Sequence, residues 1–127
     1  MTEGSLSVLV VTDHRPLSSQ IAYAFPEGVA VSFATDANEA RRMMRETTPS
    51  VVVMDIRTGN AGGYGLSRDM VADARLSDVP RLVLLERHQD SWLAKQAGAT
   101  RYRVMPISDE ELVEEALALA SEMPAAS

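Results

Sequence analysis

The sequence contains no cysteine among its 127 residues, and this absence excludes several kinds of chemistry. Without cysteine the chain forms no disulfide, thiolate metal site or iron–sulfur cluster, and it has no cysteine nucleophile. Lysine is almost absent as well, since eleven arginines accompany the single Lys95. Any mechanism that requires a lysine therefore has one candidate.

An excess of positive charge and a long apolar run are also missing. The formal charge is −6 and the isoelectric point is near 4.8, whereas binding to a nucleic-acid backbone requires clustered Lys and Arg. No apolar run approaches the roughly 20 residues that span a bilayer, and the opening residues MTEGS lack the regions of a signal peptide. We therefore expect a cytoplasmic protein that binds neither nucleic acid directly nor a membrane.

The composition that remains is that of an ordinary globular protein. Hydrophobic residues make up 46% of the chain and charged residues 24%, which is enough to build one compact core. Linkers, internal repeats and low-complexity segments are not evident. We predict a single domain over residues 1–127, with its core at about 6–122.

Apolar periodicity predicts five strands alternating with five helices. The strands are expected at 7–11, 29–33, 51–54, 81–85 and 102–105, and the helices at 16–25, 36–46, 66–75, 91–96 and from 108 onward. Asp36 is expected to cap the second helix, and Ser108 with Glu111 forms a capping box for the last. Such alternation with short connections predicts an α/β fold, a doubly wound parallel sheet covered on both faces.

Two aspartates follow the first and third predicted strands directly or after one residue. In the flavodoxin-like strand order 2-1-3-4-5, ligands lie beyond the carboxyl ends of these two strands, where Asp13 and Asp55 are expected. Two neighbouring carboxylates repel unless a proton or cation intervenes, and a hard ion such as Mg²⁺ takes oxygen ligands of this kind. The alternative is that each acid caps a helix or is solvated.

Motifs of small-molecule catalysis are not supported. Asp55 begins a segment similar to the aspartate-nucleophile phosphohydrolase motif, but Arg57 occupies the place of its general acid. Gly59 to Gly65 is not followed by the lysine of a phosphate-binding loop, and no nucleophile elbow or HExxH spacing is present. We predict that the protein is not an enzyme.

Four segments in order make the chain resemble a response-regulator receiver domain over residues 6–122. They are VLVVTD at 8–13, SVVVMD at 50–55, AGATRY at 97–102, and Met105-Pro106 before the capped last helix. The resemblance implies the 2-1-3-4-5 sheet, two-component signalling and a phosphorelay. It also implies that Asp55 accepts a phosphoryl group from a histidine kinase or phosphotransfer protein, while Asp13, Asp55 and the backbone carbonyl of Arg57 hold Mg²⁺.

The chain departs from the receiver pattern at three positions of the phosphorylation machinery. Thr12 stands where the family has an acid, Leu85 where it has Ser or Thr, and Met105 where it has lysine. Tyr102 retains the aromatic residue of the family's switch. The Ser or Thr hydroxyl that triggers this switch in the family is missing, because Leu85 stands in its place. The chain is thus expected to be an atypical receiver with a weakened Mg²⁺ site.

Basic residues near the predicted site offer a partial replacement for the missing lysine. They are Arg57, Arg87, His88, Arg101 and Arg103. Arginine suits phosphate, but most charged residues lie on surfaces, so we interpret this set as surface charges.

Two hypotheses follow. In the first, Asp55 still accepts phosphate in a receiver that passes a signal to a downstream protein. In the second, the chain is a phosphorylation-independent, receiver-like protein-interaction module. The resemblance further implies a homodimer through the helix at 91–96, the strand at 102–105 and the last helix, where Trp92 could anchor an interface.

Overall fold

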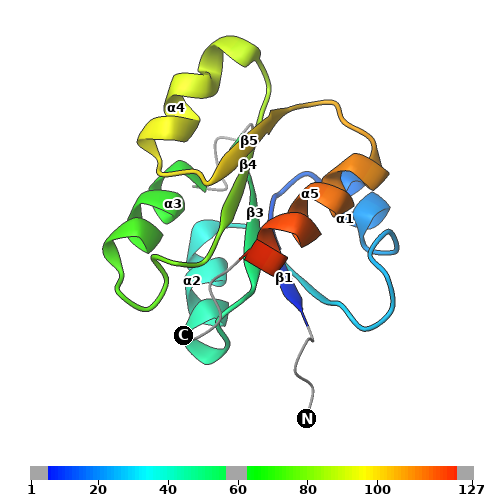
Figure 1. Cartoon of the computed structure of the whole chain (residues 1–127), viewed down its shortest axis with the longest axis horizontal. Helices are drawn as coiled ribbons and strands as arrows, with labels where there is room; N and C mark the ends of the chain where they lie inside the picture. Colours follow the sequence, from blue (N-terminus) through cyan, green and yellow to red (C-terminus); the bar gives the residue numbers. More distant parts are fainter. Residues whose placement is uncertain (1–5, 57–62, 123–127) are drawn as a thin grey trace.

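The computed structural model describes residues 6–56 and 63–122 and contains a parallel five-stranded sheet in the order β2-β1-β3-β4-β5 (Figure 1). This confirms the predicted flavodoxin-like fold. The strands are β1 (Ser7–Val11), β2 (Ala30–Ala34), β3 (Val51–Asp55), β4 (Arg81–Leu85) and β5 (Arg101–Val104). Two of the five match their predicted bounds, β3 ends one residue later on Asp55, and β2 and β5 are displaced by one residue.

Five α-helices cover the two faces of the sheet. They are α1 (Arg15–Ile21), α2 (Ala37–Glu46), α3 (Gly63–Ala72), α4 (Ser91–Gln96) and α5 (Asp109–Glu122). Figure 1 shows α1 and α5 on one side of the sheet and α2, α3 and α4 on the other. No helix of the described part is long and apolar enough to cross a membrane.

The predicted cap of α2 is present, and of the capping box predicted for α5 the bond to the Ser108 hydroxyl is present. The Asp36 carboxylate accepts a hydrogen bond from the Glu39 backbone N–H at 2.8 Å, and Ser108 Oγ accepts one from the Glu111 N–H at 3.0 Å. Each bond satisfies a backbone donor that the first turn of a helix leaves without a partner.

The first and third helices differ from their predicted bounds. Helix α1 ends at Ile21 instead of continuing to residue 25. The Ala24 N–H donates to the Ile21 carbonyl at 3.1 Å, a turn bond to the third residue back in place of the helical bond to the fourth. Helix α3 begins at Gly63, inside the predicted loop, and ends at Ala72, three residues early. There the Asp73 side chain accepts from the Arg75 N–H at 2.8 Å, a local bond that competes with the helix.

The core has two layers, one on each face of the sheet. Along β3 the side chains alternate between them, so that Val52 and Met54 join the layer under α2, α3 and α4 while Val51 and Val53 join the layer under α1 and α5. Every residue of β3 and β4 is buried. These central strands place the end of β3 deep in the molecule.

Candidate functional site

The carboxyl edge of the sheet brings Thr12 and Asp55 together. Val11 pairs with Met54 in the β1–β3 register, so the residues that follow this pair lie next to each other. Asp55 is the last residue of β3 and is completely buried, and Thr12 is 3% exposed. A carboxylate without contact with bulk solvent depends on protein groups for its stabilisation.

A short hydrogen bond joins the two side chains. Thr12 Oγ1 donates to Asp55 Oδ2 at 2.8 Å. Thr12 Oγ1 also accepts a hydrogen bond from the His14 backbone N–H at 3.0 Å. The Thr12 backbone N–H donates to the Ala34 carbonyl at 3.0 Å, which fixes the residue between β1 and β2. The Thr12 hydroxyl thus uses its single proton on Asp55 while the surrounding backbone holds it in place.

Asp13 lies one residue further along, and its side chain is exposed. At the end of β1, Thr12 contacts the Asp55 carboxylate through its hydroxyl. Among residues 6–56 and 63–122, no group of three or more His, Cys, Asp or Glu side chains is arranged to hold a metal ion. Arg57, whose backbone carbonyl was predicted to be a further ligand, falls outside the described residues.

Leu85 and Met105, the other two positions where a departure from the receiver pattern was expected, have apolar side chains. Leu85 ends β4, is 1% exposed and belongs to the core layer under α2, α3 and α4. Met105 follows β5, is half-buried and packs against the layer under α1 and α5. Tyr102 is half-buried against the same layer as Leu85. Neither Leu85 nor Met105 has a group that could hydrogen-bond or neutralise a phosphoryl group at neutral pH.

The basic residues on β5 form ion pairs with α5. Arg103 contacts Glu115 at 2.9 Å and Glu111 at 3.4 Å, and Arg101 contacts Glu115 at 2.8 Å. The hydrogen bond from Arg103, together with Arg101, holds the pKa of Glu115 below its usual value, although burial acts in the opposite direction. Arg87 is exposed and pairs with Asp90 at 3.2 Å. These contacts agree with the interpretation that Arg87, Arg101 and Arg103 are charges of the protein surface.

Trp92 lies on α4 with 56% of its surface exposed. This exposure is large for the only tryptophan of the chain, and it leaves the ring available to a partner.

One buried charged residue was not foreseen. Arg81 begins β4 and is 8% exposed, and its guanidinium donates to the carbonyls of Val79 at 2.7 Å, Gly98 at 2.9 Å and Ser77 at 3.3 Å. Burial lowers the pKa of Arg81. The available signal in the sequence was an arginine at the start of a strand that is otherwise entirely apolar.

Comparison with known proteins agrees with this architecture. The model of the response regulator receiver domain matches residues 8–117. Protein PilH of Pseudomonas aeruginosa is 26% identical over 110 residues, which cover 83% of this chain and 90% of PilH. The probable transcriptional regulator ycf27 of Guillardia theta is 34% identical over 87 residues, 67% of this chain and 33% of that protein.

Solved structures show the same fold at lower identity. The chemotaxis response regulator CheY4 of Vibrio cholerae superposes with a TM-score of 0.79 at 21% identity, covering 90% of this chain and 98% of that one. A second structure is the receiver domain of the sensor histidine kinase PA1611 of Pseudomonas aeruginosa, solved with a magnesium ion in its active-site cleft. It superposes with a TM-score of 0.77 at 23% identity, covering 93% of this chain and 99% of that one. The family match covers most of the sequence, and the chain therefore belongs to the response-regulator receiver domains of two-component systems.

Proposed function

We propose that this receiver domain is a protein-interaction module whose conformation does not depend on phosphorylation of Asp55. The observation that carries the proposal is the buried Asp55 carboxylate, held by the Thr12 hydroxyl at 2.8 Å. In this arrangement the end of β3 is closed by a neutral side chain from the end of β1. A partner protein would then read the surface of the domain in one stable state.

Charge supports the same conclusion. A phosphoryl group on Asp55 would add about two negative charges at neutral pH, next to a buried edge of the sheet. Met105 brings no positive charge to this edge, and Arg103 on β5 is paired with the acids of α5. Leu85 cannot donate a hydrogen bond to the phosphoryl oxygens. An acyl phosphate would thus receive neither a positive charge from Met105 nor a hydrogen bond from Leu85.

The donor set for Mg²⁺ is reduced. Magnesium is usually held by one or two carboxylates together with waters and phosphate oxygens, and Asp13 and Asp55 are donors of this class. Thr12 stands where the family has a further acid. Its hydroxyl proton is donated to Asp55 Oδ2, so one of the two Asp55 oxygens is already engaged in a hydrogen bond. We therefore propose a weakened Mg²⁺ site at Asp13 and Asp55, with the Arg57 carbonyl as the expected further ligand.

The second candidate is a receiver in which Asp55 remains a phosphoacceptor. Its support is the position of the carboxylate at the end of β3, next to the end of β1, where ligands bind in doubly wound sheets. In this case a histidine kinase or phosphotransfer protein supplies the phosphoryl group.

Intact-mass spectrometry after incubation with acetyl phosphate and Mg²⁺ distinguishes the candidates. The proposal expects no phosphoryl adduct on the wild type, as for Asp55→Asn. A triple variant, Thr12→Asp with Leu85→Thr and Met105→Lys, restores the three receiver positions and is the positive control. A wild-type adduct that disappears in Asp55→Asn would support the phosphoacceptor instead.

The interaction surface is proposed to include α4, β5 and α5, with exposed Trp92 as its anchor. A downstream protein or a second copy of the chain in the cytoplasm is the expected partner. Light scattering of wild type and Trp92→Ala over a range of concentrations tests the homodimer. A concentration-dependent dimer that Trp92→Ala weakens supports it, and a monomer at all concentrations contradicts it.

A further inference from the structure

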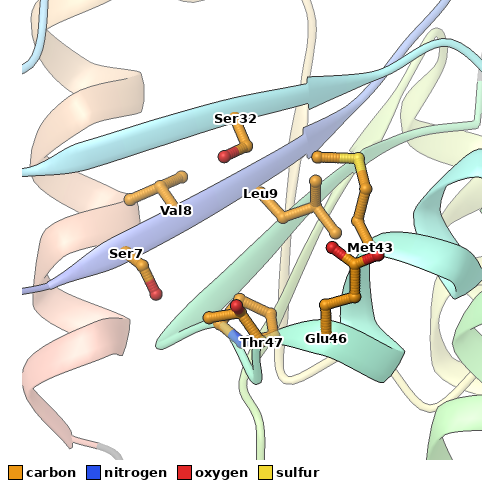
Figure 2. Close-up of a pocket in the computed structure, with 8 residues that line it drawn as sticks. Ser7, Val8, Leu9, Ser32, Met43, Glu46 and Thr47 are labelled. Atoms are coloured by element: carbon orange, nitrogen blue, oxygen red, sulfur yellow. The ribbon is translucent and has the colours of Figure 1, made fainter.

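A cavity of about 190 Å³ lies between the edge of the sheet and the end of α2. Its lining comes from β1 and β2 and from the last turn of α2 with the segment that follows it, including Leu9, Ser32, Met43 and Glu46 (Figure 2). β1 starts here with Ser7 and runs away toward Thr12. The cavity is therefore at the opposite edge of the sheet from Asp55.

The sequence of β2 explains why this space is open. Side chains alternate along a strand, and Val31 and Phe33 pack into the core layer under α1 and α5. The other face of β2 carries small residues, Ala30, Ser32 and Ala34, of which the first two are exposed. The strand lies at the edge of the sheet, so no further strand covers it. Small side chains on an edge strand beside a helix leave a gap.

The cavity combines an apolar wall with one charged group. Leu9 is 3% exposed, Met43 is half-buried and Glu46 is exposed, and Figure 2 shows the Glu46 carboxylate pointing from α2 toward β1 beside them. Within the described residues, no hydrogen bond or ion pair engages this carboxylate. Among the lining residues, Glu46 is the one with a charge. Earlier on α2, Arg42 pairs with Glu39 at 3.7 Å.

The hydroxyls of Ser7, Ser32 and Thr47 are the other polar side-chain groups of the lining. Ser7 Oγ accepts from the Ser50 N–H at 3.2 Å and so retains its own proton for donation. Ser32 Oγ lines the cavity from β2 (Figure 2). An anionic ligand would be repelled by Glu46, and a purely apolar ligand would cover the carboxylate without pairing it.

We propose that this cavity is a binding site for a small organic cation, a primary ammonium on a compact hydrocarbon body. The ammonium pairs with Glu46 and the hydrocarbon packs on Leu9 and Met43. An apolar cavity of about 150 Å³ holds benzene, so this space suits a body of about six to eight non-hydrogen atoms. The site is separate from Asp55, and the proposal does not rest on how the domain is phosphorylated.

The test is a titration of the ¹⁵N-labelled full chain with cyclohexylamine, followed by amide chemical shifts. We expect saturable shifts confined to β1, β2 and the end of α2. Cyclohexanol has the same size without charge, and cyclohexanecarboxylate has the opposite charge. Because a charge-assisted hydrogen bond contributes strongly to affinity, cyclohexanol should bind about tenfold more weakly, and the carboxylate should not bind.

Matched variants assign the site. Glu46→Gln should weaken cyclohexylamine binding about tenfold, since it removes the ion pair. Glu110→Gln removes the same charge from an exposed position on α5 and should leave binding unchanged. Ser32→Val fills the cavity with a residue that favours strands and should also weaken binding. Shifts that do not saturate, that move to the acids of α5, or that are unaffected by Glu46→Gln would overturn the proposal. Equal binding of cyclohexanol would overturn its cationic part.

Discussion

Two buried charged side chains lie at opposite edges of the sheet and are stabilised in different ways. Arg81, at the start of β4, is surrounded by three backbone carbonyls from the turn before β4 and the turn after α4. Asp55, at the end of β3, is held by the side chain of Thr12. Arg81 joins two segments that are far apart in sequence, whereas the Thr12 hydroxyl reaches Asp55 from the end of the neighbouring strand.

The two charged groups differ in whether their hydrogen-bond partners are backbone or side-chain groups. Backbone carbonyls are present whatever the side chains are, so the partners of Arg81 would remain unsatisfied without it. The Thr12 hydroxyl that donates to Asp55 belongs to a side chain, so a single substitution removes this bond. The Arg81 contacts therefore rest mainly on the backbone, whereas the Thr12–Asp55 contact rests on the identity of one side chain.

The largest expected effect comes from removing the Arg81 guanidinium. Arg81→Met keeps much of the apolar stem but leaves the carbonyls of Val79 and Gly98 without this donor. Removing one partner from a buried charged network typically costs 3–5 kcal/mol, and since these partners are neutral we expect about 3 kcal/mol. Urea unfolding measures the loss. Arg81→Lys, which retains one charged donor group, should lose less; equal stability of Arg81→Met and wild type would contradict the structural role.

Gly98 tests the same edge through the backbone. Its φ is +83°, which favours glycine, and a Cβ there would overlap the Val71 side chain. We expect Gly98→Ala to lower the free energy of unfolding by about 1–2 kcal/mol. Val71→Ala removes the overlap but not the positive φ at residue 98. Gly98→Ala should therefore cost less stability in the Val71→Ala background than in the wild type. Full additivity of the two losses would show that the overlap is relieved in another way.

At the opposite edge, Thr12→Val removes the hydroxyl and keeps the shape of the side chain. Asp55 Oδ2 loses a donor and the His14 N–H loses an acceptor, so we expect a loss of about 1–2 kcal/mol. Thermal or urea unfolding in wild-type and Asp55→Asn backgrounds gives the coupling energy between the two side chains. A coupling energy near zero would mean that the Thr12–Asp55 contact has no energetic role.

The smallest effect concerns pH and the exposed charges of β5 and α5. The hydrogen bond from Arg103 and the charge of Arg101 lower the pKa of Glu115 in the folded state. This contribution to stability is present above the unfolded pKa, near 4.5, and is lost as pH falls through the folded value. Because the arginines are about one third exposed or more, we expect less than about 1 kcal/mol. Glu115→Gln should flatten this acid-side decline, and an unchanged pH profile would contradict the assignment.

Much of the fold could be predicted because it rests on local patterns. The apolar runs of β1 and β4 gave their bounds, and Asp36 and Ser108 marked the starts of α2 and α5. The misplaced ends have local causes that compete with periodicity. After Ile21 the Ala24 N–H bonds to a carbonyl three residues back instead of four, and Asp73 forms a side-chain bond with the backbone two residues on.

The candidate site was predicted only in part. The end of β3 was identified from Asp55, but the contact with Thr12 depends on the β1–β3 register, which a sequence pattern does not supply. Arg81 was missed for a similar reason, since its carbonyl partners come from two turns on either side of α4 in the chain. The cavity beside Glu46 was also not anticipated, because it is formed by what small side chains leave unfilled.

The sequence by itself determined the number of strands and helices and the parallel sheet, since residue type and spacing act over a few residues. Only the tertiary structure decided which groups meet. It joined Thr12 to Asp55 across the sheet, enclosed Arg81 in carbonyls and left Glu46 beside an open cavity. These outcomes depend on packing between distant segments, and packing is a property of the assembled fold.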